Sequence, residues 1–339
     1  MNNVENKSND ELHLFFVQSS TTEFAARAAI DFLSLKHDQI EFITLRNYLP
    51  FSKIKTTPIP INKLWKRTTN GEITKLLNNY SISYKTRPIC CYLPQTSLSY
   101  INAFYNSNQV KEINLIEEGS ANYIFRRDEY KYGKLSTKYL NSFINWILKF
   151  IGIKYFPFIK KPFFSSNLNK LYLLDGNANI DFPTNDRLVF DFKKIIQLIF
   201  KKETLKNTPN SVLLVLDPVS NVAELSYNII TKLRVIDEIS KSHTKNLFIK
   251  PHPKDFQSKH LDNLMEIIIN SLNLNVIITD DCIEKLILQQ RIVVLLSARS
   301  SASFYAKKLG TKVIQFPVAE ATNFNEKKID DWLQRSVFN

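Results

Sequence analysis

Short apolar runs alternate with longer amphipathic stretches in the first half of the chain. Apolar residues at positions 24, 25, 28 and 32 recur at helical spacing, which predicts a helix from residue 22 to about residue 36. A further helix is predicted around residues 97–106. The apolar runs have the length of strands, and they lie at residues 12–17, 40–45, 88–93 and 112–116.

The second half repeats this alternation more regularly. Strands are predicted at residues 211–216, 246–250, 276–279, 292–296 and 312–316. Helices are predicted at residues 221–241, 261–272, 283–289 and 301–309. Short apolar strands that alternate with helices are typical of parallel sheets, which helices cover on both faces.

The chain of 339 residues therefore divides into two α/β domains. The N-terminal domain is expected over residues 1–175, and a linker follows over residues 176–210. A second domain is expected over residues 211–320, and residues 321–339 contain a final amphipathic helix. Ligands of open parallel sheets bind at the carboxyl ends of the strands, so the loops after the strands are the candidate sites.

Composition narrows the kinds of site that these loops can form. No two of the six glycines stand close enough to make a G-x-G-x-x-G or a Walker A loop, which excludes nucleotide binding through a glycine-rich loop. The 45 Lys and Arg residues exceed the 32 Asp and Glu residues by 13. This excess comes from residues 42–71 and 130–174, which contain no acidic residue, so the positive charge belongs to the N-terminal half.

Nothing in the sequence indicates export or a membrane span. The first residues are polar and lack the apolar core of a signal peptide, and no apolar run reaches the length of about 18 residues that a spanning helix needs. Cys90, Cys91 and Cys282 are too few for a disulfide framework, and no Cys/His spacing indicates zinc. The simplest interpretation is a cytoplasmic protein.

Two adjacent carboxylates follow the strand predicted at residues 112–116. Glu117 and Glu118 precede Gly119 and Ser120, and the glycine permits a tight turn at the end of the strand. Neighbouring like charges raise each other's pKa, which suits a general base. A solvated acidic turn is the alternative, and the residues alone leave both open.

A histidine between two prolines follows the strand at residues 246–250. The prolines in Lys250-Pro251-His252-Pro253 restrict the backbone and thereby set the direction of the imidazole ring. An imidazole donor with a lysine two residues earlier suits a phosphate oxygen. A proline-stiffened turn with an exposed histidine fits the same residues equally well.

Ser300 and Ser301 follow the strand at residues 292–296 and lead into a helix. Serine hydroxyls and free N–H groups at a helix start can bind an anion without glycines, although ordinary helix capping also explains them. Glu284, at another helix start, either accepts hydrogen bonds from ribose hydroxyls or stabilises the first turn. Asp280 and Asp281 invite a metal interpretation, but no neighbouring motif completes a metal site.

In this order, the three loops resemble the motifs of the bacterial sialyltransferases that act on lipooligosaccharide and capsular polysaccharide. That family is marked by a D/E-D/E-G motif, an HP motif and a paired-serine motif. Here they read Glu117-Glu118-Gly119, His252-Pro253 and Ser300-Ser301. The resemblance covers about residues 112–310 as separate loops. It implies a GT-B fold, in which two Rossmann-like parallel-sheet domains face a central cleft, and CMP-sialic acid as the donor.

The resemblance also implies roles for these residues. A carboxylate of the first motif would be the general base, with Glu117 favoured over Glu118, and Gly119 and Ser120 would lie on the acceptor side. His252 would stabilise or protonate the departing CMP phosphate. The other residues implied on the donor side are Lys250, Pro253, Glu284, Ser300 and Ser301, with Asp217 and Ser220 in a loop that closes over the nucleotide.

The expected reaction inverts the anomeric carbon and needs one base to deprotonate the acceptor hydroxyl. CMP is already a good leaving group, so cationic and hydroxyl contacts can replace a metal, and neither a metal nor a cofactor is expected. The acceptor would be a surface glycan, lipooligosaccharide or capsular polysaccharide. Another donor on the same fold, CMP-Kdo or a UDP sugar, is the nearer alternative, and a non-enzymatic protein that binds anionic polymers is the more distant one.

Lysines interleaved with large apolar residues at positions 130–174 suggest a surface that meets anionic lipid. A polyanionic glycan groove or a core helix with snorkelling lysines explains the same pattern. Peripheral contact with the cytoplasmic membrane through residues 130–170 is therefore expected. A homodimer is included among the expected partners because some members of the family that the chain resembles form dimers. Nucleic acid is not, because no nucleic-acid-binding motif is present.

Overall fold

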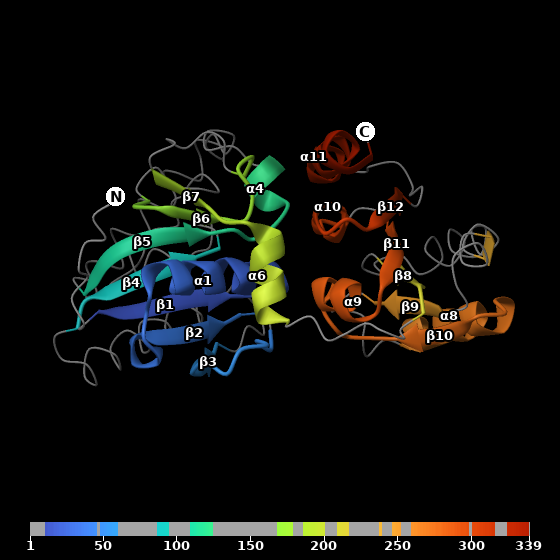
Figure 1. The fold of residues 1–339 in the computed structure, drawn as a ribbon, viewed down its shortest axis with the longest axis horizontal. Coiled ribbons are helices and arrows are strands. Elements are labelled where there is room, and N and C mark those ends of the chain that lie inside the picture. Colours follow the sequence, from blue (N-terminus) through green and yellow to red (C-terminus); the bar gives the residue numbers. More distant parts are fainter. Residues whose placement is uncertain are drawn as a thin grey trace, which may run out of the picture. The chain divides into compact units, whose positions relative to one another are not determined.

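The computed structural model describes the chain as two compact units, Met1–Asp191 and Phe192–Asn339 (Figure 1). Each unit contains one sheet in which every pair of neighbouring strands is parallel. The predicted α/β fold with two parallel sheets is thus confirmed. The described residues are 11–45, 48–59, 87–94, 109–124, 168–178, 186–200, 209–216, 237–238, 246–251, 259–297, 300–315 and 324–338.

The first unit contains a seven-stranded sheet in the order β3-β2-β1-β4-β5-β6-β7. The order reverses between β1 and β4, and such a switch point is where open α/β sheets bind ligands at the carboxyl ends of the strands. The four strands predicted in this half are confirmed as β1, β2, β4 and β5, whereas the other three were not predicted. The strands are β1 (Leu12–Val17), β2 (Ile40–Thr44), β3 (Thr56–Pro58), β4 (Ile89–Leu93), β5 (Val110–Ile116), β6 (Leu171–Leu173) and β7 (Arg187–Val189).

Helix α1 (Ser20–Leu33) connects β1 to β2 through a short 3₁₀ turn, η1 (His37–Gln39). Ser19 caps its start by accepting from the Thr22 N–H, and the Thr22 hydroxyl oxygen accepts in turn from the Ser19 N–H. The helix ends at Ser34, whose φ of 52° is left-handed. The helix predicted at residues 22–36 is therefore confirmed, with its start fixed by the capping box.

The two faces of the first sheet differ in chemistry. Leu14 and Phe16 of β1 are fully buried on one face. His13 and Phe15, on the other face, contact Tyr92 of β4, and the rings of Phe15 and Tyr92 are stacked 4.1 Å apart. The Tyr92 hydroxyl lies 3.0 Å from His13 Nδ1, so this face buries a hydrogen-bonded polar pair among aromatic rings.

The second unit contains a five-stranded sheet in the order β10-β9-β8-β11-β12, which reverses between β8 and β11. Its strands confirm all five that were predicted in this half. They are β8 (Ser211–Val215), β9 (Asn246–Lys250), β10 (Asn275–Ile278), β11 (Ile292–Ser297) and β12 (Lys312–Gln315). The helices are α6 (Phe192–Ile199), α8 (Lys259–Ser271), α9 (Ile283–Gln289), α10 (Ala302–Lys308) and α11 (Phe324–Leu333), and a π-helical turn, Gln334–Phe338, follows.

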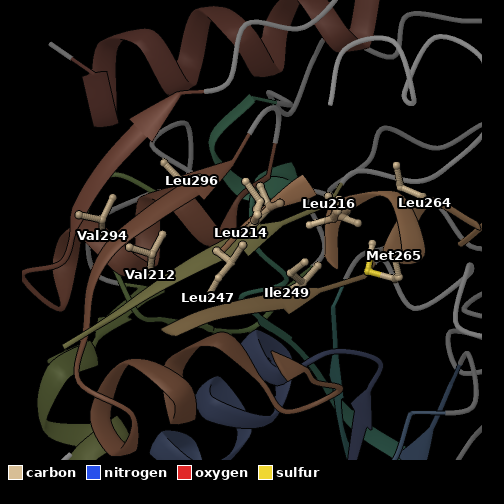
Figure 2. Close-up of a cluster of buried hydrophobic side chains, with 11 residues drawn as sticks. Val212, Leu214, Leu216, Leu247, Ile249, Leu264, Met265, Val294 and Leu296 are labelled. Carbon is tan, nitrogen blue, oxygen red and sulfur yellow. The ribbon is translucent and has the colours of Figure 1, made fainter. Parts of the chain in front are cut away.

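Successive residues of a strand point to opposite faces of the sheet, and in the second sheet the buried residues on both faces are apolar. Leu214, Leu247 and Leu296 pack on one face beside Leu264 and Met265 of α8 (Figure 2). The other face holds a second buried cluster that includes residues of β8, β9 and β11 and of helices α9 and α10. Mainly aliphatic side chains thus pack on both faces of this sheet.

Residues 176–210, for which a linker is expected, contain β7, which pairs with β6, and helix α6. The boundary between the two units falls after Asp191, between these elements. The helix predicted at residues 97–106 and most of the one predicted at residues 221–241 lie outside the described residues. Among the described residues, no helix combines the length and the hydropathy needed to cross a membrane.

Candidate active site

The acidic turn Glu117-Glu118-Gly119-Ser120 lies directly after β5, at the carboxyl edge of the first sheet. Gly119 has a φ of 126°, a left-handed conformation that L side chains rarely adopt. The Asn122 Oδ1 accepts from the N–H of Glu118 at 2.8 Å and from that of Gly119 at 3.3 Å. The shape of the turn therefore depends on the glycine and the asparagine. The turn leads into the short helix α4 (Ala121–Ile124).

Glu117 is fully buried, and both of its carboxylate oxygens accept hydrogen bonds from the same unit. The Tyr123 hydroxyl donates to Oε1 and the Leu174 N–H donates to Oε2, each at 2.7 Å. Because Leu174 directly follows β6, this carboxylate joins the ends of two neighbouring strands. Its geometry is therefore set by the fold.

Glu118 is only half-buried, in contrast to Glu117. Its Oε1 accepts from Nε2 of Gln18, the residue that follows β1. Gln18 and Asn122 were not singled out from the sequence. The position of Gln18 at the end of an apolar strand and the spacing of Asn122, four residues after Glu118, are the signals that could have indicated them.

In the second unit, Lys250 ends β9 and Glu284 lies in the first turn of α9. Burial lowers the pKa of the Lys250 ammonium, and the opposing influences that raise it come from Cys282, Glu284, Asp280 and Asp281. The Lys250 Nζ donates to the backbone oxygen of Asp280 at 3.0 Å. The structure thus brings Lys250 into electrostatic interaction with the buried side chain of Glu284.

Ser300 and Ser301 lie between the end of β11 and the start of α10. The Ser300 Oγ accepts from the Ala302 N–H at 3.2 Å, and the Ser301 side chain makes no capping hydrogen bond. Lys250 and Ser297 both pair in register with Val215 of β8, which lies between their strands. Strand spacing therefore places the backbones of Lys250 and Ser297 about 10 Å apart at the switch point.

The Asp280 and Asp281 pair is held by local contacts. Lys285 Nζ lies 2.7 Å from Asp281 Oδ1, one helical turn away, and the Asp281 N–H donates to the Thr279 hydroxyl at 3.1 Å. Within the described part of the chain, this pair does not belong to a group of three or more metal-ligating side chains.

One such group, Glu11, His13 and Cys90, lies at the amino ends of β1 and β4, with ligand atoms within 4.8 Å of one another. Lys111 Nζ donates to Glu11 Oε1, and the Cys90 thiol lies 3.4 Å from Oε2. Burial raises the pKa of Glu11, but the hydrogen bonds from Lys111 and Cys90 outweigh it and leave that pKa below its ordinary value. This network occupies the sheet edge opposite Glu117.

Several predicted site residues lie outside the described residues. They are Asp217, Ser220, His252 and Pro253. Most of the basic segment at residues 130–174, including the expected membrane contact, also lies outside. The described residues therefore contain two complete predicted motifs, the acidic turn and the serine pair, together with Lys250 and Glu284.

Comparison with known protein families identifies a family that matches most of the chain. Residues 5–316 match the model of a family described as alpha-2,8-polysialyltransferase. No curated protein matches the chain.

The fold is similar to that of solved UDP-GlcNAc 2-epimerases. That of Methanocaldococcus jannaschii is 13% identical with a TM-score of 0.54, and the match covers 97% of this chain and 93% of that one. A putative enzyme of Listeria monocytogenes is 11% identical with a TM-score of 0.55, covering 96% and 88%. The Neisseria meningitidis enzyme bound to UDP-GlcNAc is 13% identical with a TM-score of 0.53, covering 95% and 91%. At these identities the likeness shows the fold alone, which is the GT-B type with two Rossmann-like domains.

Proposed function

The chain belongs to the alpha-2,8-polysialyltransferase family, and from this premise we propose that it transfers sialic acid from CMP-sialic acid to a surface glycan. Family and fold together make it a glycosyltransferase; the donor, the acceptor and the stereochemistry are the proposal. The family's description favours an acceptor that already ends in sialic acid, as in a growing capsular polysaccharide. The observation that carries the proposal is the acidic turn at the carboxyl edge of the first sheet, inside the matched residues.

In the proposed reaction, the oxygen of an acceptor hydroxyl forms a bond to the anomeric carbon of sialic acid. The bond from that carbon to the phosphate oxygen breaks, and CMP leaves with the electron pair. The hydroxyl proton passes to a carboxylate of the enzyme, and attack from the face opposite CMP inverts the anomeric carbon. The reaction therefore needs a base on the acceptor side and a site for a phosphate on the other side.

We assign the base to the Glu117–Glu118 pair. Glu117 is oriented by two donors, and Glu118 is the half-buried member of the pair, so the two residues differ in how freely a substrate can reach them. A base must come within hydrogen-bond distance of the proton that it removes. Substitution of each residue in turn, as described in the Discussion, decides which one does so.

We assign the phosphate to the second unit. Lys250 and the Ser300–Ser301 pair flank the end of β8 and offer an ammonium group and hydroxyl groups to an anion. His252, two residues after Lys250, would stabilise or protonate the departing phosphate, and Glu284 would accept hydrogen bonds from the ribose hydroxyls. Because these groups can stabilise the leaving CMP by themselves, the proposed reaction proceeds without a metal ion.

A donor panel tests this function. Purified protein is incubated with CMP-sialic acid, CMP-Kdo or UDP-GlcNAc in a thermal-shift assay, and release of CMP or UDP is measured with an α2,8-linked oligosialic acid as the acceptor. We expect a shift in Tm and acceptor-dependent CMP release with CMP-sialic acid alone. His252→Ala should lower that release at least about 100-fold, whereas His37→Ala, at an exposed histidine, should not.

The same panel separates the alternatives. Release with CMP-Kdo or UDP-GlcNAc in place of CMP-sialic acid would reassign the donor on the same fold. Binding of the oligosialic acid without release from any donor would favour a protein that binds anionic polymers and has no transferase activity.

A further inference from the structure

We propose that Gln18 and Asn122 form a subsite beside Glu118 that binds hydroxyl groups of the acceptor sugar. The inference deepens the proposed function, because it assigns residues to the acceptor in a transfer that is itself proposed. It rests on two polar atoms of these side chains.

Gln18 lies between β1 and α1 and is 6% exposed. Its N–H donates to the Thr22 hydroxyl at 2.9 Å, which ties its backbone to the capping box of α1. Its Nε2 donates to Glu118 Oε1, and this contact fixes which way the amide is turned. The other amide atom, Oε1, is buried and has no hydrogen-bond partner among the described residues.

Asn122, which also hydrogen-bonds to Glu118, has the complementary property and is 2% exposed. Its Oδ1 accepts from the N–H groups of Glu118 and Gly119, so the turn itself determines the amide orientation. Its Nδ2 is buried, and no residue in the described part of the chain supplies it with a hydrogen-bond partner. An unused acceptor and an unused donor thus belong to two amides that are both hydrogen-bonded to Glu118.

Buried amide atoms without partners are unusual in folded proteins, because leaving them unsatisfied costs free energy. Two of them on contacts of one candidate catalytic residue indicate a ligand that supplies the missing partners. The other polar atom of each amide is hydrogen-bonded to Glu118, and this contact sets the orientation of the amide.

The pair of atoms also defines the chemistry of the ligand. A carbonyl oxygen requires a ligand that donates a proton, which a phosphate dianion or a carboxylate does not do. An N–H requires a ligand that accepts, which a metal cation does not do. A sugar hydroxyl does both, and neighbouring hydroxyls of one sugar can satisfy both amides while another approaches Glu118.

Binding of α2,8-linked tetrasialic acid in the absence of a nucleotide tests the subsite directly. Gln18→Met keeps the length of the side chain and removes its polar atoms. Asn122→Asp keeps the oxygen that the turn needs and removes the free donor. Gln39→Met and Asn169→Asp are control substitutions of the same types at the amino edge of the sheet, where Gln39 Oε1 and Asn169 Oδ1 accept from backbone N–H groups.

We expect Gln18→Met and Asn122→Asp each to weaken tetrasialic acid binding, measured by calorimetry, by about 5- to 10-fold, the size of one lost hydrogen bond. In the transfer assay they should raise the acceptor KM by the same factor and leave the KM for CMP-sialic acid within about twofold. Both controls should bind like the wild type. A purely structural role would instead lower Tm without this selective change in acceptor affinity.

The outcomes separate this inference from the proposed function. Wild-type protein that binds tetrasialic acid more tightly than both site variants, yet releases no CMP from CMP-sialic acid, would support the subsite and refute the transfer. Active wild-type protein whose acceptor KM and tetrasialic acid affinity are unchanged in both variants would overturn the subsite, with only water satisfying the two amides. Failure of the wild-type protein to bind tetrasialic acid would overturn it as well.

Discussion

The two units share one way of winding a parallel sheet and differ in what they bury around it. In both, the strand order reverses once, between β1 and β4 in the first sheet and between β8 and β11 in the second. The buried clusters on the two faces of the second sheet are mainly aliphatic, whereas one face of the first sheet buries a His13–Tyr92 hydrogen bond among aromatic rings. The two units therefore share a strand topology and differ in the side chains that they bury.

The carboxyl edges of the two sheets also differ in the side chains that they present. The first offers two carboxylates with amide neighbours, Gln18 and Asn122. The second offers a lysine, a glutamate and serines. A carboxylate suits a hydroxyl that must lose its proton, and an ammonium with hydroxyls suits a phosphate that gains charge, so the difference is the one expected for acceptor and donor sides.

The largest expected effect comes from the two glutamates of the acidic turn. The residue that acts as the base should lose kcat by about 10²- to 10⁴-fold on substitution by glutamine, the size expected for loss of a general base. Glu117→Gln should also lower Tm, because one donor to its buried carboxylate loses its acceptor. Glu118→Gln should leave Tm nearly unchanged, because that side chain is half-buried. The measurements are kcat with CMP-sialic acid, CMP affinity and thermal unfolding.

Glu23→Gln serves as a control, since Glu23 is also a buried carboxylate held by hydroxyl and N–H donors, from Tyr48, Phe51 and Ser52. It should lower Tm as Glu117→Gln does and spare kcat. Full activity in both Glu117→Gln and Glu118→Gln would break the division between acceptor and donor sides.

The next largest effect compares the two cores. Leu214→Ala removes a side chain from the aliphatic cluster of the second sheet and should cost about 2–5 kcal/mol of unfolding free energy. Tyr92→Phe, in the first sheet, removes only the hydroxyl that contacts His13 and should cost about 1 kcal/mol. Chemical unfolding curves of both variants give the two free energies. A larger loss for Tyr92→Phe would mean that the polar pair, and not ring packing, holds the first sheet.

All five strands of the second sheet were predicted from adjacent apolar residues, and these include β10 and β12, in which no residue is buried. Strands β3, β6 and β7 contain only three residues each, and β3 is Thr-Thr-Pro, so their pairing depends on neighbours distant in the sequence. Helix α6 was missed although Phe192, Ile195 and Ile196 follow helical spacing, because its surroundings were interpreted as a linker.

The sequence predicts where the candidate site lies, but it does not predict the burial and the contacts of the side chains there. The carboxyl-edge rule leads from the strand pattern to Glu117 and Glu118. It does not show that Glu117 is buried, because its partner Leu174 lies 57 residues further along the chain. The contact of Gln18 with Glu118 joins residues 100 positions apart and likewise requires the folded sheet. The pattern of a single sequence shows how residues are spaced locally, but it does not show which distant residues come into contact.

A smaller effect is expected from the charge of Lys250. Its pKa lies below the ordinary 10.5 because of burial, so its ammonium loses its proton at a lower pH than an exposed lysine. If the ammonium holds the CMP phosphate, CMP affinity should fall by about tenfold as the pH rises toward 10.5. In Lys250→Arg the guanidinium keeps its charge, so affinity should stay constant over that range. Calorimetric titration of CMP from pH 7 upward gives both curves, and coincident curves would remove Lys250 from the phosphate site.

The lowered pKa of Lys250 also makes the free energy of unfolding depend on pH. A lysine whose pKa is lower in the folded state than in the unfolded state binds its proton less readily when folded. Its contribution therefore opposes folding below the folded pKa and disappears as the pH rises through 10.5. Lys250→Met should remove this contribution, so the difference in unfolding free energy from the wild type, measured by chemical unfolding from pH 7 upward, should shrink as the pH rises.

The smallest effect is expected from Asp281, the acidic residue of the second unit that invites a metal interpretation. Its carboxylate lies 2.7 Å from Lys285 Nζ, and both side chains are about one-third or more exposed. A partly exposed i,i+4 ion pair of this kind contributes about 0.3–0.5 kcal/mol. Asp281→Asn should therefore change Tm no more than Glu266→Gln, a substitution at an exposed acid of α8, and should leave kcat within about twofold in the presence of Mg²⁺ or of EDTA. A loss of activity that Mg²⁺ restores in wild-type protein and not in Asp281→Asn would place a metal on the donor side, and the contrast between a carboxylate edge and a metal-free phosphate edge would no longer hold.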